Sequence, residues 1–350
     1  MKSTSAKVVD LFCGAGGLTY GLEAVGLDVV EGVDIDPACK YAYEKNTKSR
    51  YVQKSARDYT AEDLEAAWGK AKRRILVGCA PCQPFSTYTQ GSRGTYRTKW
   101  VLLNTFADLV EDTRPQIVSM ENVTPLEKKE AFKKFVRRLR RVGYNVSHSI
   151  VDCRLYGAPQ MRRRLVLLAS LLGPINLIAP THPEQADWIT VQSAIGNLKP
   201  LKAGGVDKKD LVHRSSKLSD LNMKRIRASK PGGTWRDWPK ELVADCHAKE
   251  SGKTYPGVYG RMEWDKPSPT ITGQAFGFGN GRFGHPTQNR ALSLREAALL
   301  QTFPPDYEFV EPGETPSMKT VGRMIGNAVP PILGEVIGNS ISQHFQEFGG

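Results

Sequence analysis

The stretch Gly78-Cys79-Ala80-Pro81-Cys82-Gln83-Pro84-Phe85-Ser86 decides the fold of this chain. It follows the apolar run Ile75-Leu76-Val77, which predicts a short buried strand, and its prolines and glycine predict a loop. We therefore expect Cys82 just beyond the carboxyl end of a strand, where open α/β sheets bind their ligands. A thiol becomes a nucleophile when its pKa falls, and a helix N-terminus or nearby positive side chains lower it.

Two other interpretations of this stretch follow from the spacing of Cys79 and Cys82, which is that of a redox pair or half a metal site. No second Cys-x-x-Cys or His pair completes four ligands, so we predict no metal. The context also differs from that of a thioredoxin-like pair. Cys39 and Cys153 fit the usual fate of a lone thiol, burial without reactivity, whereas Cys82 between two prolines does not.

The composition limits the class of protein. With 350 residues and 40% hydrophobic content, the chain can bury a core of one large or two unequal domains. Its net charge of +13 favours a polyanionic partner. Six cysteines, no signal peptide and no apolar run of membrane-spanning length predict a cytoplasmic protein without disulfides and without a membrane partner.

The N-terminal region predicts a nucleotide-binding βα unit. Residues 7–12 favour a strand, the glycines of 13–17 a turn, and the segment to Gly26 an amphipathic helix. A second predicted strand, 27–33, ends at Asp34-Ile35-Asp36, an acidic tip about 20 residues on that can bind ribose hydroxyls. NAD stays possible on these residues alone, although the turn lacks the Gly-x-Gly-x-x-Gly spacing.

The strand and helix pattern continues beyond this unit. Asp58-Tyr59-Thr60 ends a third short unit, and a predicted strand over 115–120 leads to Glu121. Glu121 follows its strand as Cys82 follows its own, so both should face one pocket. We expect helices over residues 61–72, 102–110 and 133–141, the last one basic and solvated.

The segment Gln160 to Arg164 precedes the apolar run 165–168. Alternation within one strand would place Gln160, Arg162 and Arg164 on the same face. Two arginines on one face can hold an anion or a base carbonyl.

Six ordered blocks make the chain resemble the DNA (cytosine-5)-methyltransferase family. They span nearly the whole sequence and are Asp10-Leu11-Phe12-Cys13-Gly14-Ala15-Gly16-Gly17, Pro81-Cys82-Gln83-Pro84-Phe85-Ser86, Glu121-Asn122-Val123, Gln160-Met161-Arg162-Arg163-Arg164, Arg290 to Glu296 with Leu300 to Pro304, and Gly326-Asn327-Ala328-Val329-Pro330-Pro331.

The resemblance implies an enzyme that transfers a methyl group from S-adenosylmethionine to C5 of cytosine in a specific duplex sequence. Cys82 would add to C6 of a flipped base as a covalent nucleophile, and Glu121 would hold N3 and the exocyclic amine. Arg164, with Arg162 alongside, would grip the O2 side. Residues implied to bind the cofactor are Phe12, Gly14, Gly16, Gly17, Asp34, Ile35, Asp58, Tyr59, Pro81, Asn327 and Val329.

The expected fold is α/β: a Rossmann-like S-adenosylmethionine-dependent methyltransferase domain, discontinuous over 1–178 and 318–350, and a smaller irregular target-recognition domain over 179–317. A helix over 318–338 should pack back on the large domain. Candidate DNA contacts are Gln83, Ser86, Arg261, Thr272, Gln274, Arg282 and Gln288.

The expected partner is double-stranded DNA, with a restriction endonuclease acting separately. We expect a monomer of prokaryotic or phage origin. Two alternatives remain: the tRNA-directed branch of the family, whose Cys-Phe-Thr signature is missing here, and a DNA-binding pseudoenzyme, which the intact Cys82, Glu121 and Arg164 disfavour.

Overall fold

The structure is a computed structural model that describes residues 6–81, 100–249, 252 and 254–349. The chain divides into two compact units. Unit 1 comprises Met1–Cys153, Arg163–Pro180 and Val329–Gly350, and unit 2 comprises Arg154–Arg162 and Thr181–Ala328.

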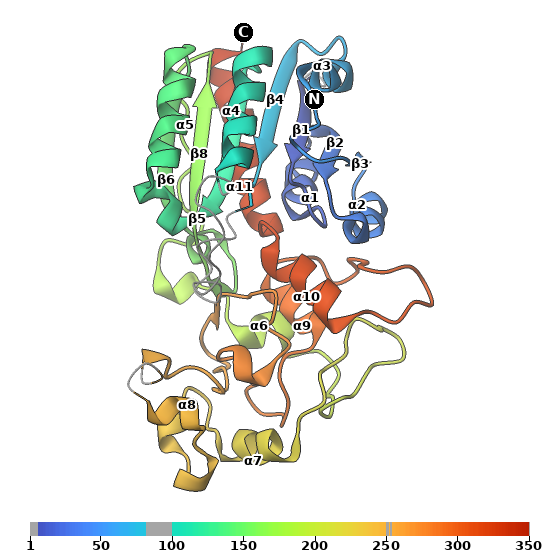
Figure 1. The fold of residues 1–350 in the computed structure, drawn as a ribbon, viewed down its shortest axis with the longest axis vertical. Helices are drawn as coiled ribbons and strands as arrows, with labels where there is room; N and C mark the ends of the chain where they lie inside the picture. Colours follow the sequence, from blue (N-terminus) through green and yellow to red (C-terminus); the bar gives the residue numbers. More distant parts are fainter. Residues whose placement is uncertain (1–5, 82–99, 250–251, 253, 350) are drawn as a thin grey trace. The chain divides into compact units, whose positions relative to one another are not determined.

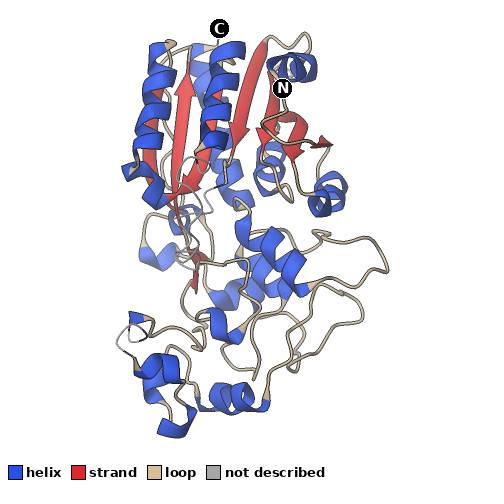
Figure 2. Ribbon diagram, in the orientation of Figure 1, coloured by secondary structure: helices blue, strands red, loops and turns tan. Residues whose placement is uncertain are grey.

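A seven-stranded sheet forms the centre of unit 1 (Figures 1 and 2), in the order β3-β2-β1-β4-β5-β8-β6. β1 to β5 pair in parallel, and β8 runs antiparallel to both β5 and β6. The carboxyl ends of β1, β2, β4 and β5 therefore meet at one edge of the sheet. The strands are β1 Ala6–Leu11, β2 Asp28–Asp34, β3 Arg50–Gln53, β4 Arg73–Gly78, β5 Ile117–Val123, β6 Asn145–Asp152 and β8 Arg163–Ser170.

Helices cover both faces of this sheet, because its strands are apolar on both sides. The helices of unit 1 are α1 Gly17–Ala24, α2 Lys40–Asn46, α3 Ala61–Trp68, α4 Val101–Thr113, α5 Glu130–Arg141 and α11 Pro331–Phe348. Leu11 and Met120 join the core that α3, α4 and α5 cover. By alternation, their neighbours Asp10 and Glu121 point to the opposite face.

α1 and α11 pack against each other in unit 1. A Cβ on Gly21 would lie 2.1 Å from the Pro331 carbonyl oxygen and 2.8 Å from Gly334 Cα. Only glycine allows this close approach. α1 is thereby held closely against α11.

Unit 2 contains little regular structure, as the sequence predicts. Its helices are α6 Val191–Ile195, α7 Asp220–Ala228, α8 Asp245–Ala248, α9 Leu294–Leu300 and α10 Met318–Asn327, and β7 Gln160–Met161 pairs with β9 Ser268–Pro269. Short 3-10 segments in the two units are Pro37–Cys39, Thr124–Lys128, Cys153–Tyr156, Gln185–Asp187, Trp235–Asp237, Lys240–Leu242 and Phe278–Asn280.

The helix predicted over 318–338 is wrong, since α10 ends at Asn327 and α11 begins at Pro331. Proline lacks an N–H and forces the residue before it out of the helical region, and Pro330 and Pro331 follow each other here. α10 packs on α9 within unit 2, and only α11 packs on α1 in unit 1. The limits of the units accordingly differ from the expected domain limits at 318–328, and also at 154–162.

The single strand expected over Gln160 to Arg164 is also wrong. The pairing breaks at Arg162: Gln160 and Met161 pair with β9 in unit 2, and β8 starts at Arg163 in unit 1. Alternation does not extend across this break, so Arg162 and Arg164 do not share a strand face.

Candidate active site

The Glu121 carboxyl group, near the end of β5, is the centre of the candidate site. Arg164, near the start of β8, lies opposite Val123 in the antiparallel pairing. Arg164 Nε lies 2.9 Å from Glu121 Oε1, and the two side chains are 14% and 3% exposed. The structure thus joins two of the predicted catalytic residues in a largely buried ion pair.

A third side chain, which the sequence did not indicate, contacts the same carboxyl group. Cys79 follows β4, and its Sγ donates to Glu121 Oε2 at 2.8 Å. The sequence signal was present in the Cys79-x-x-Cys82 spacing, but it pointed to redox or metal chemistry. Neither spacing nor alternation shows that Cys79 faces the end of the neighbouring strand.

The segment that leads to Cys82 is anchored beside Glu121. Asn122 Nδ2 donates to the Ala80 carbonyl oxygen at 2.9 Å, and Cys79 N donates to the Leu11 carbonyl oxygen at 3.2 Å. Pro81 is exposed. The predicted nucleophile Cys82 and the predicted DNA contacts Gln83 and Ser86 lie outside the described residues.

The turn between β1 and α1 has the backbone expected of a ligand-binding loop. Phe12, Gly14 and Gly16 have φ of 63°, 53° and 90°. A Cβ on Gly14 would have no neighbour within 4 Å, so the backbone there borders open space. Gly17 begins α1. The turn can therefore approach a ligand with its main chain.

Asp34, at the end of β2, lies next to this turn. Its Oδ2 accepts from Gly14 N at 2.9 Å, and its Oδ1 accepts from Asp36 N at 2.9 Å. Ile35 beside it is a large apolar side chain that is 68% exposed. A fixed carboxylate with an uncovered apolar neighbour fits a ribose and an adenine ring.

The two other predicted adenine contacts lie differently. Asp58 is exposed. The Tyr59 side chain is only 3% exposed, and its hydroxyl donates to Glu31 Oε2 at 2.8 Å. Burial, together with this carboxylate, raises the pKa of Tyr59. The phenol is thus built into the core, and the predicted contact of Tyr59 with an adenine stays a prediction.

Asp10, from the first matching block, is a buried acid that the sequence did not single out. Its Oδ2 accepts from Thr19 Oγ1 at 2.7 Å, whereas its buried Oδ1 has no hydrogen-bond partner among the described residues. Burial raises the pKa of Asp10 from 3.8 to about 7; the Thr19 hydrogen bond lowers it and the Asp34 charge raises it. A buried oxygen without a partner beneath a Gly-rich turn fits a site for a polar or cationic group.

Arg162 lies in unit 2 and has structural partners. It is 1% exposed and donates to the carbonyl oxygens of Ile271 at 3.0 Å, Ala328 at 3.0 Å and Gly326 at 3.3 Å. Asn327, at the end of α10 in unit 2, is exposed, and Val329 in unit 1 is 5% exposed. The predicted roles of these residues toward base or cofactor stay predictions.

The candidate DNA contacts of unit 2 fall into two groups. Arg261 is 5% exposed and donates to the carbonyls of Ile226, Ser229, His285 and Gln288. Gln288 Oε1 accepts from Leu201 N and Arg290 Nε, and Arg282 donates to the Gly233 carbonyl at 2.6 Å. Gln274 is exposed and Thr272 is half-buried. Gln274 is the most accessible of the described candidates.

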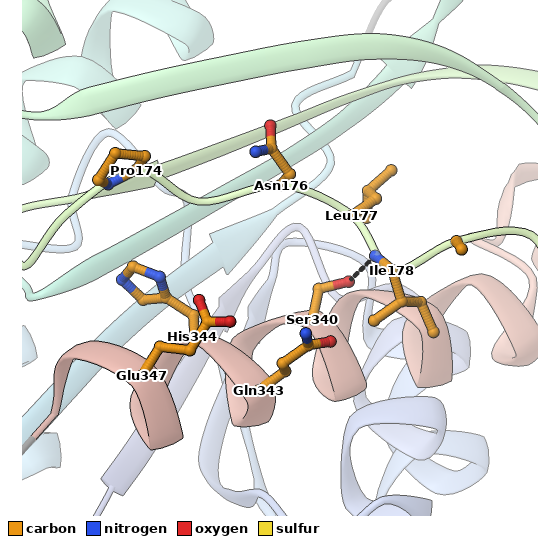
Figure 3. A pocket seen from close by; sticks show the side chains of 9 residues that line it. Pro174, Asn176, Leu177, Ile178, Ser340, Gln343, His344 and Glu347 are labelled. Carbon is orange, nitrogen blue, oxygen red and sulfur yellow. Dashed lines mark hydrogen bonds between the residues drawn. The ribbon is translucent and has the colours of Figure 1, made fainter.

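A cavity of about 250 Å³ in unit 1 lies away from this site (Figure 3). It is lined by Pro174, by residues 176–179 and by Ser340, Gln343, His344 and Glu347 of α11. Ser340 Oγ accepts from Ile178 N at 3.0 Å within it. These residues follow the end of β8, which runs antiparallel to β5, so the cavity lies toward the amino edge of the parallel strands.

Neither a metal site nor a membrane span occurs in the part of the chain that the structure describes. Among those residues, no group of three or more His, Cys, Asp or Glu side chains can hold a metal ion. None of their helices combines the length and apolar character that crossing a bilayer requires.

The sheet order, the Gly-rich turn with Asp34 and the Glu121–Arg164 pair define the class of S-adenosylmethionine-dependent methyltransferases. A comparison with known families identifies the member: residues 6–343 match the C-5 cytosine-specific DNA methylases, and the chain belongs to this family. It is a DNA (cytosine-5)-methyltransferase whose substrate is DNA and whose methyl donor is S-adenosylmethionine. NAD is thereby excluded as the cofactor of the N-terminal turn.

Known relatives cover the whole chain. It is 52% identical over 342 residues to the Type II methylase M.HgiDII of Herpetosiphon aurantiacus, covering 97% of this chain and 96% of the relative. It is 30% identical over 349 residues to the Type II methyltransferase M1.HphI of Haemophilus parahaemolyticus, covering 96% and 87%.

Solved structures share the fold. A putative DNA modification methyltransferase encoded within an E. coli prophage matches with a TM-score of 0.72 at 21% identity, covering 97% of this chain and 99% of that one. The S. pombe Dnmt2 methyltransferase matches with a TM-score of 0.58 at 17% identity, covering 97% and 98%. The predicted α/β methyltransferase fold is confirmed.

Proposed function

We propose that Cys82 is the nucleophile of this methyltransferase and that Glu121 and Arg164 assist it. The observation that carries the proposal is the buried Glu121–Arg164 pair, 2.9 Å apart, beside the anchored segment Cys79 to Pro81 that leads to Cys82. Arg164 also places a positive charge at this edge of the sheet, and a positive charge favours a thiolate.

The reaction requires a nucleophile because C5 of cytosine is itself weakly nucleophilic. The Cys82 thiolate adds to C6, and the electron pair of the C5–C6 double bond moves to the ring and makes C5 reactive. S-adenosylmethionine, when bound, would supply the methyl group that C5 takes, and its sulfonium sulfur would keep the electron pair of the broken S–CH3 bond. Removal of the C5 proton then returns its electron pair to the C5–C6 bond and expels Cys82.

Glu121 stabilises the ring while Cys82 is attached. Its carboxyl group shares a proton with N3 and accepts from the exocyclic amine, so that negative charge arriving on the ring is held. Arg164 contacts Glu121 through Nε and donates from Nη1 to the Arg163 carbonyl oxygen at 2.9 Å, and we assign its Nη2 to the base O2. Arg162 holds the Ile271 and Ala328 backbone, so we assign it a structural part within unit 2.

We assign the methyl donor, S-adenosylmethionine, to the edge of the sheet formed by β1 and β2. The open main chain at Gly14 and the orphan Oδ1 of Asp10 suit its methionine part, Asp34 suits the ribose hydroxyls, and exposed Ile35 suits the adenine face. The proposed set is completed by Phe12, Gly16, Gly17, Asp58, Tyr59, Pro81, Asn327 and Val329. Asp34→Asn should therefore weaken binding of the donor in equilibrium dialysis, a measurement that needs no turnover.

The target cytosine must leave the duplex to reach Cys82, because C6 is inaccessible in the stack. We assign donor binding and catalysis to unit 1 and recognition of the DNA sequence to unit 2. Thr272 and Gln274 are the described side chains that we expect to read bases or phosphates, with Gln83 and Ser86 on the catalytic loop.

The biological setting is proposed from the relatives, which are Type II methylases of bacteria. We assign the chain to a restriction-modification system of a bacterium or phage, in the cytoplasm, where it protects DNA from a separate restriction endonuclease. We expect it to act as a monomer, since a methylase can modify one strand at a time.

The proposal is tested with a duplex that carries 5-fluorocytosine at the target position. The target is first found by bisulfite sequencing of plasmid DNA from cells that express the chain. Because fluorine cannot leave as the proton does, the wild-type protein and the control Cys153→Ala should form a covalent adduct that survives denaturing electrophoresis. Cys82→Ser should bind the duplex without forming it. An equal adduct in Cys82→Ser would refute the assignment.

A further inference from the structure

Both oxygens of the Glu121 carboxyl group are contacted from neighbouring strands. Cys79 Sγ lies 2.8 Å from Oε2 on the β4 side, and Arg164 Nε lies 2.9 Å from Oε1 on the β8 side. Glu121 is 3% exposed, so water takes little part in fixing it. Among the described residues, the carboxyl group is thus held by one hydrogen bond, from the Cys79 thiol to Oε2, and by the charge of the Arg164 guanidinium beside Oε1, which makes no aligned hydrogen bond there.

The backbone keeps the Cys79 thiol in this place. Cys79 N donates to the Leu11 carbonyl at 3.2 Å, which continues the β1–β4 pairing by one residue. Asn122 Nδ2 bonds the carbonyl of the next residue, Ala80, at 2.9 Å. These bonds tie Cys79 to β1 and to the residue that follows Glu121, so the thiol and the carboxyl group form one unit.

The geometry points to Cys79 as a positioning residue for methyl transfer, acting through Glu121. The last torsion of a glutamate side chain is broad, so a carboxyl group without partners on both oxygens rotates. Cys79 removes this freedom, because its thiol donates to Oε2 and holds the plane of the carboxyl group. This inference rests on the proposed role of Glu121 toward the cytosine.

The test compares Cys79→Ala, which removes the donor, with Cys79→Ser, which keeps one, and uses Cys153→Ala as the control for loss of a buried thiol. In single-turnover methyl transfer, Cys79→Ala should be about tenfold slower, and Cys79→Ser should recover to within about threefold of wild type. The dissociation constant of the donor should be the same in all four proteins.

Two results would overturn the inference: a Cys79→Ala protein with an unchanged rate of methyl transfer, or equal losses of rate in the alanine and serine variants. The Cys82→Ser variant distinguishes failure of this inference from failure of the proposed nucleophile. If Cys82→Ser still turns over, the proposed nucleophile is wrong. If it is inactive while Cys79→Ala behaves as wild type, only the positioning role fails.

Discussion

The two units use buried polar side chains in opposite ways. In unit 1, Glu121 and Asp10 are buried on one face of a regular sheet whose backbone is already hydrogen-bonded, and Asp10 Oδ1 has no hydrogen-bond partner among the described residues. In unit 2, Arg162 and Arg261 are buried and donate to backbone carbonyls that no sheet satisfies.

This difference follows from the need to pair every buried carbonyl. A sheet pairs its backbone internally, so its buried acids remain available for ligands. An irregular unit lacks that pairing, and guanidinium groups, each with five N–H donors, take its place. Buried charge therefore indicates chemistry in unit 1 and architecture in unit 2.

The largest expected effect concerns the acid of unit 1. Glu121→Gln should reduce single-turnover methyl transfer by about 10²-fold to 10⁴-fold, the range for loss of an acid–base group. The melting temperature should change little, because the amide still fills the site. Glu127→Gln, in the 3-10 segment beyond β5, is the matched control and should keep its rate. A rate near wild type in Glu121→Gln would place the chemistry elsewhere.

The next effect concerns the architecture of unit 2. Arg290 and Glu296 are 0% and 1% exposed and joined by two hydrogen bonds, Nη1 to Oε2 at 2.7 Å and Nη2 to Oε1 at 2.6 Å. Arg290→Met leaves the carboxylate buried without its partner and should lower the free energy of unfolding by about 3–5 kcal/mol in urea titrations.

The control for this variant is Arg137→Met in unit 1. The Arg137–Glu130 pair is 62% and 72% exposed, so its loss should change the free energy of unfolding little. Similar losses of unfolding free energy in the two variants would contradict the structural role that we assign to buried arginines in unit 2.

The pKa of Asp10 gives a pH-dependent prediction. Because the pKa is about 7 in the folded chain and 3.8 in the unfolded one, the folded state binds the extra proton between these values. This contribution to stability is full below about pH 4 and is lost as pH rises to about 7. The loss amounts to at most about 4 kcal/mol.

Asp10→Asn removes the titration. Its stability relative to wild type should therefore increase from pH 4 to pH 8 in denaturant titrations, and a constant difference would show that Asp10 is ionised throughout. Asp28→Asn, at the exposed start of β2, is the control and should show no such trend.

The smallest effect concerns the helix contact in unit 1. Gly21→Ala places a methyl group against the backbone of α11 and should cost about 1–3 kcal/mol, as overpacking does. Gly257→Ala in unit 2 is the control, since a Cβ there meets its nearest neighbour at 3.8 Å. Equal melting temperatures for the two variants would mean that α1 and α11 can separate without cost.

The sequence predicted unit 1 well because its signals are local. Apolar runs followed by Gly16, Asp34 and Glu121 mark strand ends, and parallel strands bring their ends to one edge. Proline chemistry also predicts that the helix breaks at Pro330, but the apolar residues of 318–338 favour one continuous helix. The role of Cys82 as the nucleophile remains a prediction from its sequence motif and its position after a strand.

The parts that the sequence missed depend on distant contacts. The burial of Arg162 and Arg261 comes from carbonyls up to about 165 residues away along the chain, at Ala328 and elsewhere. The Cys79 contact depends on the side chain orientation at the end of β4, which residue spacing does not encode. Tyr59 was expected at the adenine, and only its bond to Glu31 shows that the ring faces inward.

The chain passes from one unit to the other at four points, after residues 153, 162, 180 and 328. Unit 2 is therefore two insertions, and the shorter one, Arg154–Arg162, contributes Gln160 and Arg162 to its interior. A chimaera that takes only residues 181–328 from a relative with another target sequence would combine the relative's carbonyl groups with Gln160 and Arg162 of this chain. The two sides of these hydrogen bonds would then come from different proteins. Exchange of target specificity between such enzymes should succeed when the nine-residue insertion, 154–162, is transferred together with the longer insertion, 181–328.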